Sequence, residues 1–188
     1  KLANLSQPPF QTTLLGVVKG ALDHFGIKHA DAAAFGGSGH AFLINVHDEI
    51  CPSGPYCWKH DGLFPLVRNL GIEMENLGFF EGASTPAERA AVESKLIAAL
   101  DAGLPCAVQN MENQLIAGYE DGRFLLLRPW ECAPEITPAT LTFGTWAELG
   151  EEVHASFFVL RKVDPAPHEK LLRDSLRFAC DVFLKPTQ

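Results

Sequence analysis

The chain has 188 residues, 47% of them hydrophobic, and a formal net charge of −8 with acidic residues scattered along its length. This size and apolar fraction suit one packed domain over residues 1–188, and the acidic balance argues against a nucleic-acid partner, which needs a basic face. Every apolar run is shorter than the roughly 20 residues that cross a bilayer, so we expect no membrane partner. Five cysteines without a Cys-x-x-Cys pair indicate free thiols, as in a cytoplasmic protein.

The chain begins with an extended lead-in over residues 1–9 and continues into a helix. Apolar residues recur at the spacing of one helical face over residues 11–25. Thr12 or Thr13 is the expected capping residue, and Gly26 is the expected terminator.

A second short helix is expected over residues 29–35, where it meets a glycine-rich junction at residues 36–39. Glycine lacks a Cβ, so this junction predicts close packing of the backbone. Residues 40–47 then alternate in polarity and predict a strand, with His40 and His47 on opposite faces.

The middle of the chain predicts a helix over residues 59–70 and a strand over residues 72–80. Thr85 and Glu88 form a capping box with proline between them at the first helical position. This is a specific signal for the start of a helix. That helix is expected to run to Gly103.

The last third predicts an antiparallel meander and a closing helix. Glu-Asp-Gly at residues 120–122 is typical of a hairpin turn, since Asp-Gly favours positive φ angles. Strands are expected at residues 104–109, 114–119, 123–127, 141–143 and 155–163, followed by an amphipathic helix over residues 165–184. Helices before and after such a sheet give an α+β architecture.

Several short motifs carry a family resemblance. They are Phe-Gly-Gly-Ser-Gly-His-Ala-Phe at residues 35–42, Ala-Gly-Leu-Pro at 102–105, Ala-Gly-Tyr-Glu-Asp at 117–121 and Leu-Arg-Pro at 127–129. The later motifs resemble the second half of papain-like cysteine peptidases of the bacteriocin-leader-processing kind. The first motif, with the helix before it, resembles the amino-terminal domain of butirosin-type acyltransferases, which is similar in fold to those peptidases.

The resemblance implies a papain-like fold, with amino-terminal helices packed on a mainly antiparallel sheet. It also implies a cysteine at the start of the first helix, a histidine on a central strand and an acid or amide that orients it. Here the helix offers Thr12 and Thr13, the strand begins at Glu112 and Asn113, and Arg128 stands at the orienting position. We therefore do not carry peptidase activity over, and we expect a catalytically altered domain that binds a small molecule or peptide.

Side chains at the edges of the meander lie where a papain-like cleft would open. They could line a pocket with Trp130 as a stacking wall, or they could be ordinary strand-end residues. The candidate ligand-binding residues are Thr12, Thr13, Glu112, Asn113, Tyr119 and Trp130.

A rival interpretation keeps catalysis but moves the nucleophile to Cys51, with His47 or His40 as its base, in an acyltransferase or amidohydrolase. The alternative for Cys51 is a buried loop thiol. His47, Cys51, Cys57 and His60 also offer four donors to zinc, but their spacing matches no recurring zinc motif. The prediction is therefore no metal and no cofactor.

A third interpretation belongs to a different class of function. The closing helix around Phe178 and Phe183 could pack against a partner subunit, as in a homo-oligomer, or against a further carboxy-terminal domain. The chain would then serve as an accessory module. Light scattering across concentrations separates this interpretation from the other two.

Overall fold

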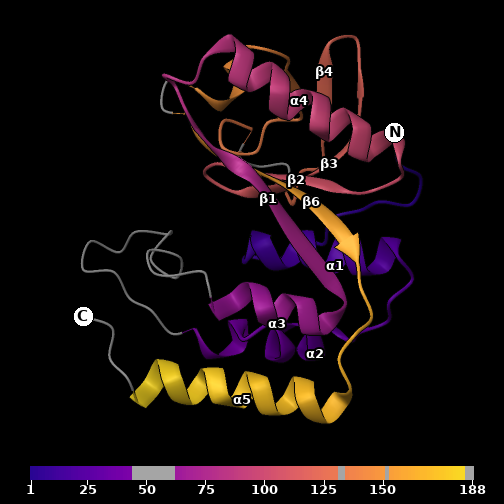
Figure 1. Cartoon of the computed structure of the whole chain (residues 1–188), viewed down its shortest axis with the longest axis vertical. Coiled ribbons are helices and arrows are strands. Elements are labelled where there is room, and N and C mark those ends of the chain that lie inside the picture. Colours follow the sequence, from indigo (N-terminus) through magenta and orange to yellow (C-terminus); the bar gives the residue numbers. More distant parts are fainter. Residues whose placement is uncertain (44–61, 131–133, 151–152, 185–188) are drawn as a thin grey trace. The chain divides into compact units, whose positions relative to one another are not determined.

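The computed structural model of the chain describes residues 1–43, 62–130, 134–150 and 153–184 (Figure 1). It comprises two compact units. The first unit consists of Lys1–Ile27 and Met74–Arg161, and it holds most of a β-sheet. The second unit consists of Lys28–Glu73 and Lys162–Gln188 and is largely helical where it is described.

The described residues form a six-stranded sheet in the order β1-β6-β2-β3-β4-β5. Its strands are β1 (Ile72–Glu81), β2 (Cys106–Gln109), β3 (Asn113–Glu120), β4 (Arg123–Leu126), β5 (Thr140–Thr142) and β6 (His154–Lys162). The pairings from β6 through β2, β3 and β4 to β5 are all antiparallel. The α+β class and the predicted meander are therefore confirmed.

The turn between β3 and β4 adopts the geometry that its sequence predicts. Asp121 has a φ of 46° and Gly122 a φ of 74°, so both central residues are left-handed. This is the backbone of a tight hairpin turn whose twist matches that of the strands. The turn sets the register in which Glu120 faces Arg123.

Helices α1 (Thr13–His24) and α4 (Pro86–Asp101) pack on opposite faces of the sheet in the first unit. Ile116 of β3 belongs to the apolar core that also contains Leu96 of α4. Its neighbour Leu115 points to the other face, where its side chain meets α1. Both faces of β3 are thus buried, which explains its run of buried residues.

The predicted capping box at the start of α4 is confirmed. The Glu88 backbone N–H donates to Thr85 Oγ1 at 3.3 Å, and the Thr85 N–H donates to the Glu88 carboxylate at 2.8 Å. The Thr85 hydroxyl also donates to Glu88 Oε2 at 2.8 Å. The hydrogen bonds that the Thr85 N–H and hydroxyl donate to the carboxylate hold the pKa of Glu88 below its ordinary value. Two otherwise unsatisfied amides are satisfied locally, so the helix begins where the sequence predicts.

The described part of the second unit is built from short helices and one longer helix. They are α2 (Asp31–Gly37), the 3-10 helix η1 (His40–Phe42), α3 (Leu63–Leu70) and α5 (His168–Leu184). A Cβ on Gly37 would lie 2.8 Å from a methyl of Leu70 and 2.9 Å from one of Leu171. The glycine-rich junction therefore does allow close packing, as predicted.

The predicted strand over residues 40–47 is wrong at its start. Gly39 has a φ of 83° and turns the chain, after which the Phe42 N–H donates to the Gly39 carbonyl at 3.0 Å. Residues 40–42 therefore form the 3-10 helix η1 instead of the start of a β-strand. Residues 44–47 lie outside the described residues.

Candidate functional site at the start of α1 and β3

The start of α1 and the start of β3 meet in the first unit, and a single threonine joins them. Thr13 Oγ1 donates to Glu112 Oε2 at 2.6 Å. The same oxygen accepts from the Asn113 backbone N–H at 3.0 Å and from Asn113 Nδ2 at 3.4 Å. The structure therefore brings together three of the six candidate ligand-binding residues.

Local hydrogen bonds fix both ends of this contact. Thr12 is the N-cap residue of α1, as predicted, but its side chain makes no capping hydrogen bond. Its carbonyl instead accepts from the Leu15 N–H at 3.0 Å, which starts the helix. On the sheet side, the Asn110 N–H donates to the Glu112 carbonyl at 3.1 Å and closes the turn that presents Glu112.

Gln7 is a part of this site that the sequence did not reveal. Its Nε2 donates to the Asn113 carbonyl at 2.8 Å, and its Oε1 accepts from the Leu115 N–H at 2.8 Å. A primary amide has one donor side and one acceptor side, so this side chain satisfies the two strand groups as a neighbouring peptide would. Its partners lie 106 and 108 residues away, and no local pattern marks it.

The Thr13 hydroxyl is committed to the protein. A hydroxyl has one proton to donate and two lone pairs to accept with, and Thr13 uses the proton on Glu112 and its oxygen on Asn113. Thr13 is only 2% exposed, whereas Glu112 and Thr12 are half-buried. Attack by this oxygen on a substrate carbonyl would require the network to break first.

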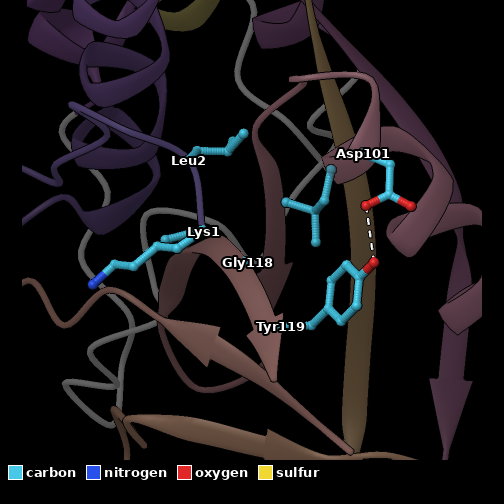
Figure 2. A pocket seen from close by; sticks show the side chains of 7 residues that line it. Lys1, Leu2, Asp101, Gly118 and Tyr119 are labelled. Atoms are coloured by element: carbon cyan, nitrogen blue, oxygen red, sulfur yellow. Dashed lines mark hydrogen bonds between the residues drawn. The ribbon is translucent and has the colours of Figure 1, made fainter. Parts of the chain in front are cut away.

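Tyr119 and Trp130 are not part of this network. Tyr119 lies at the opposite end of β3, where its hydroxyl donates to Asp101 Oδ1 at 2.9 Å beside a small cavity (Figure 2). Trp130 is half-buried beyond the end of β4. In the part of the chain that the structure describes, the Thr13 hydroxyl makes its hydrogen bonds with Glu112 and Asn113 and none with Trp130.

His40 lies in the second unit, in a buried pair with a serine. Its Nδ1 is 2.9 Å from Ser38 Oγ, which is itself fully buried. Cys51 and His47 lie outside the described residues, so the relocated nucleophile stays a prediction. Cys57 and His60, the other two side chains that were weighed as zinc donors, also lie outside the described residues.

The buried thiol of Cys106 is unsuited to nucleophilic chemistry. Burial raises its pKa to about 12, although the charge of Arg161 opposes the shift. The reactive form of a cysteine is the thiolate, which is scarce at neutral pH with such a pKa. Within the described ranges, no group of three or more His, Cys, Asp or Glu side chains is placed to hold a metal ion.

Comparison of the chain with protein-family models, with curated proteins and with solved structures gave no match. The geometry therefore has to carry the functional argument by itself. None of the helices in the described ranges is both long and apolar enough to cross a membrane.

Proposed function

We propose that this chain is a catalytically altered papain-like domain that binds a small molecule or peptide without hydrolysing it. The papain-like cysteine peptidases that this sequence resembles carry a cysteine at the start of the first helix and a histidine on a central strand. In this chain those two places hold Thr13 and the pair Glu112 and Asn113, and they are in hydrogen-bonding contact. That contact is the observation that carries the proposal.

The chemistry at this contact favours binding over hydrolysis. An alcohol is a weak nucleophile unless a base beside it can take its proton and leave the oxygen free to attack. Glu112 accepts a hydrogen bond from the Thr13 hydroxyl, as such a base would. However, Thr13 is buried, and its hydroxyl oxygen accepts hydrogen bonds from both the backbone N–H and Nδ2 of Asn113. Thr13 and Asn113 then act as positioning residues, while the half-buried Glu112 and Thr12 are the members that a ligand can reach.

The proposal is tested with a panel of fluorogenic peptides and acyl donors, followed by ligand screening through protein-observed NMR. We expect no turnover above background, and we expect hits that shift the amide signals of residues 12 and 112. Glu112→Ala should abolish those shifts, whereas Glu120→Gln, an exposed acid at the far end of β3, should leave them unchanged. Turnover that scales with protein concentration and disappears in Thr13→Val contradicts the proposal.

A second candidate function is self-association through α5, favoured by its exposed apolar side chains. Leu172 and Leu176 are each 49% exposed and Phe183 is 58% exposed, and their spacing of four and seven residues places them on one face of the helix. Large apolar patches on a surface mark interaction sites. Sedimentation velocity over a hundredfold concentration range should show a dimer that Leu176→Glu converts to monomer; a monomer throughout excludes this function.

A further inference from the structure

One face of the sheet in the first unit carries a row of side chains that begins beside the Thr13 network. Gln109 of β2 is the register partner of both Asn113 of β3 and Ser156 of β6. Partners in a ladder point to the same face, and His154 shares this face with Ser156 because side chains alternate along a strand. It is the face on which α1 packs, since Asn113 is hydrogen-bonded to Thr13.

The row ends in an exposed aromatic pair. The rings of Phe79 in β1 and His154 in β6 are nearly parallel, with an interplanar angle of 17° and centroids 6.1 Å apart. Of the large apolar side chains that the structure describes in the first unit, Met111 at 69% and Phe79 at 58% are the most exposed. Apolar side chains gathered on a surface mark interaction sites, and a stacked ring favours a further aromatic group.

Asn110 joins this aromatic pair to Glu112. Its Oδ1 accepts from the His154 backbone N–H at 3.2 Å, and its own N–H donates to the Glu112 carbonyl at 3.1 Å. One carboxylate oxygen of Glu112 accepts from the Thr13 hydroxyl, and the other makes no hydrogen bond within the described residues. Because a carboxylate can only accept hydrogen bonds, this second oxygen favours a cationic donor.

Between its two ends the row is polar and partly open. Gln109 and Ser156 are half-buried, and in the described part of the chain neither side chain makes a hydrogen bond. An amide and a hydroxyl can each donate and accept, which is what a peptide backbone requires of its partners. The segments 79–81, 109–113 and 154–156 contain no lysine or arginine, whereas Glu81 adds a second exposed carboxylate. The charge of the row is therefore complementary to a basic ligand.

We propose that this row binds an extended peptide with a lysine or arginine side chain and, about four residues from it, an aromatic side chain. The cation pairs with Glu112, and the aromatic ring lies on Phe79 and His154. Three strand spacings of about 4.8 Å separate β3 from β1, so the ligand has to span about 14 Å. An extended chain advances about 3.4 Å per residue, which sets the separation at about four residues. The inference rests on the function proposed above and narrows its ligand to a peptide.

The probe is the peptide acetyl-Lys-Ala-Ala-Ala-Phe-amide, titrated into the ¹⁵N-labelled full chain. Saturable shifts are expected at the amides of residues 79, 112 and 154. Two altered peptides test the two groups separately, one with alanine in place of the phenylalanine and one with glutamate in place of the lysine. Each should bind about fivefold more weakly, which is typical of one stacked ring or one partly exposed ion pair.

Variants of the protein identify which end of the row reads which group. Phe79→Ala should no longer distinguish the phenylalanine peptide from the alanine peptide, but it should still prefer lysine over glutamate. Glu112→Gln should show the reverse pattern. Glu120→Gln, an exposed acid at the far end of β3, should keep both preferences.

The proposal is overturned by shifts that do not saturate, by equal binding of the three peptides, or by a Phe79→Ala variant that still prefers phenylalanine. The spectrum of each variant shows whether it is folded, and His154→Ala replaces Phe79→Ala if the latter is not. Failure here is distinguishable from failure of the proposed function. Ligands that shift the amides of residues 12 and 112 equally in the parent and in Phe79→Ala support that function alone, whereas turnover contradicts it whatever the peptide does.

Discussion

Two buried charges on α4 hold a loop that is distant in the sequence. Glu93 Oε1 accepts from Trp146 Nε1 at 2.8 Å and from the Gly144 N–H at 2.6 Å. One turn earlier, the Arg89 guanidinium donates to the Thr145 carbonyl and lies 4.8 Å from the centre of the Trp146 ring. Trp146 has a φ of 51°, a left-handed conformation that bulky residues rarely adopt. Hydrogen bonds from both sides therefore stabilise a backbone that is unfavourable by itself.

This arrangement predicts a large effect for one truncation. Glu93→Ala leaves the Trp146 and Gly144 N–H groups buried without an acceptor, so we expect the free energy of unfolding to fall by about 2–4 kcal/mol. Urea unfolding followed by tryptophan fluorescence measures this loss. Lys95→Ala, an exposed change on the same helix, should stay within about 0.5 kcal/mol of the parent. A Glu93→Ala variant as stable as Lys95→Ala would contradict the role given to the carboxylate.

At the scale of elements, α1 is shaped by glycines on the side that faces the lead-in. A Cβ on Gly20 would lie 2.2 Å from the Ser6 carbonyl oxygen and 2.6 Å from a methyl of Leu115. A Cβ on Gly16 would lie 2.8 Å from the Pro8 carbonyl oxygen. Glycine inside a helix costs about 1 kcal/mol relative to alanine, so close approach of the backbone is the reason that these positions hold glycine.

Gly20→Ala should therefore destabilise the protein in spite of its better helix propensity. Backbone must move to admit the methyl group, and overpacking of this kind costs about 1–3 kcal/mol. Gly36→Ala in α2 is the matched control, because its Cβ would meet no atom within 4 Å and should add up to about 1 kcal/mol of stability. Thermal unfolding of both variants gives the two signs. Equal stabilisation by both would show that the lead-in does not press on α1.

Signals from neighbouring residues predicted most helices and strands, whereas contacts between residues far apart in the sequence could not be predicted from such signals. The capping box and the helical period of α1 involve residues within a few positions, so the sequence carries them directly. The contact of Thr13 with Glu112 spans 99 residues, and only the family resemblance pointed to both ends of it. Nothing in the sequence around Gln7 indicated that its side chain would pair with β3. The strand predicted from residue 40 failed because a short alternating run does not reveal the left-handed turn at Gly39.

Across the whole molecule, ionisable groups with shifted pKa values set the pH range of stability. At Glu148, burial opposes ionisation, but hydrogen bonds from the Thr142 N–H and hydroxyl outweigh it and lower the pKa. At Asp174, hydrogen bonds from Lys170 and Asn69 lower the pKa. A lowered pKa in the folded state means stability that is present above the unfolded pKa and lost as the pH falls. Protonation of these two carboxyls therefore lowers the stability of the protein as the pH falls.

On the alkaline side, the buried thiol of Cys106 contributes a loss of stability. Burial raises the pKa of this thiol from 9.0 to about 12, so the unfolded chain loses its proton first and stability declines as the pH rises above 9. At about pH 10.5 the expected loss is about 2 kcal/mol relative to neutral pH, since each pKa unit is worth about 1.4 kcal/mol. Urea unfolding in steps from pH 7 to 11 should show this decline, and it should be flatter in Cys106→Ala. Cys180→Ser removes an exposed thiol and should keep the slope of the parent, whereas an unchanged slope in Cys106→Ala would place the alkaline loss elsewhere.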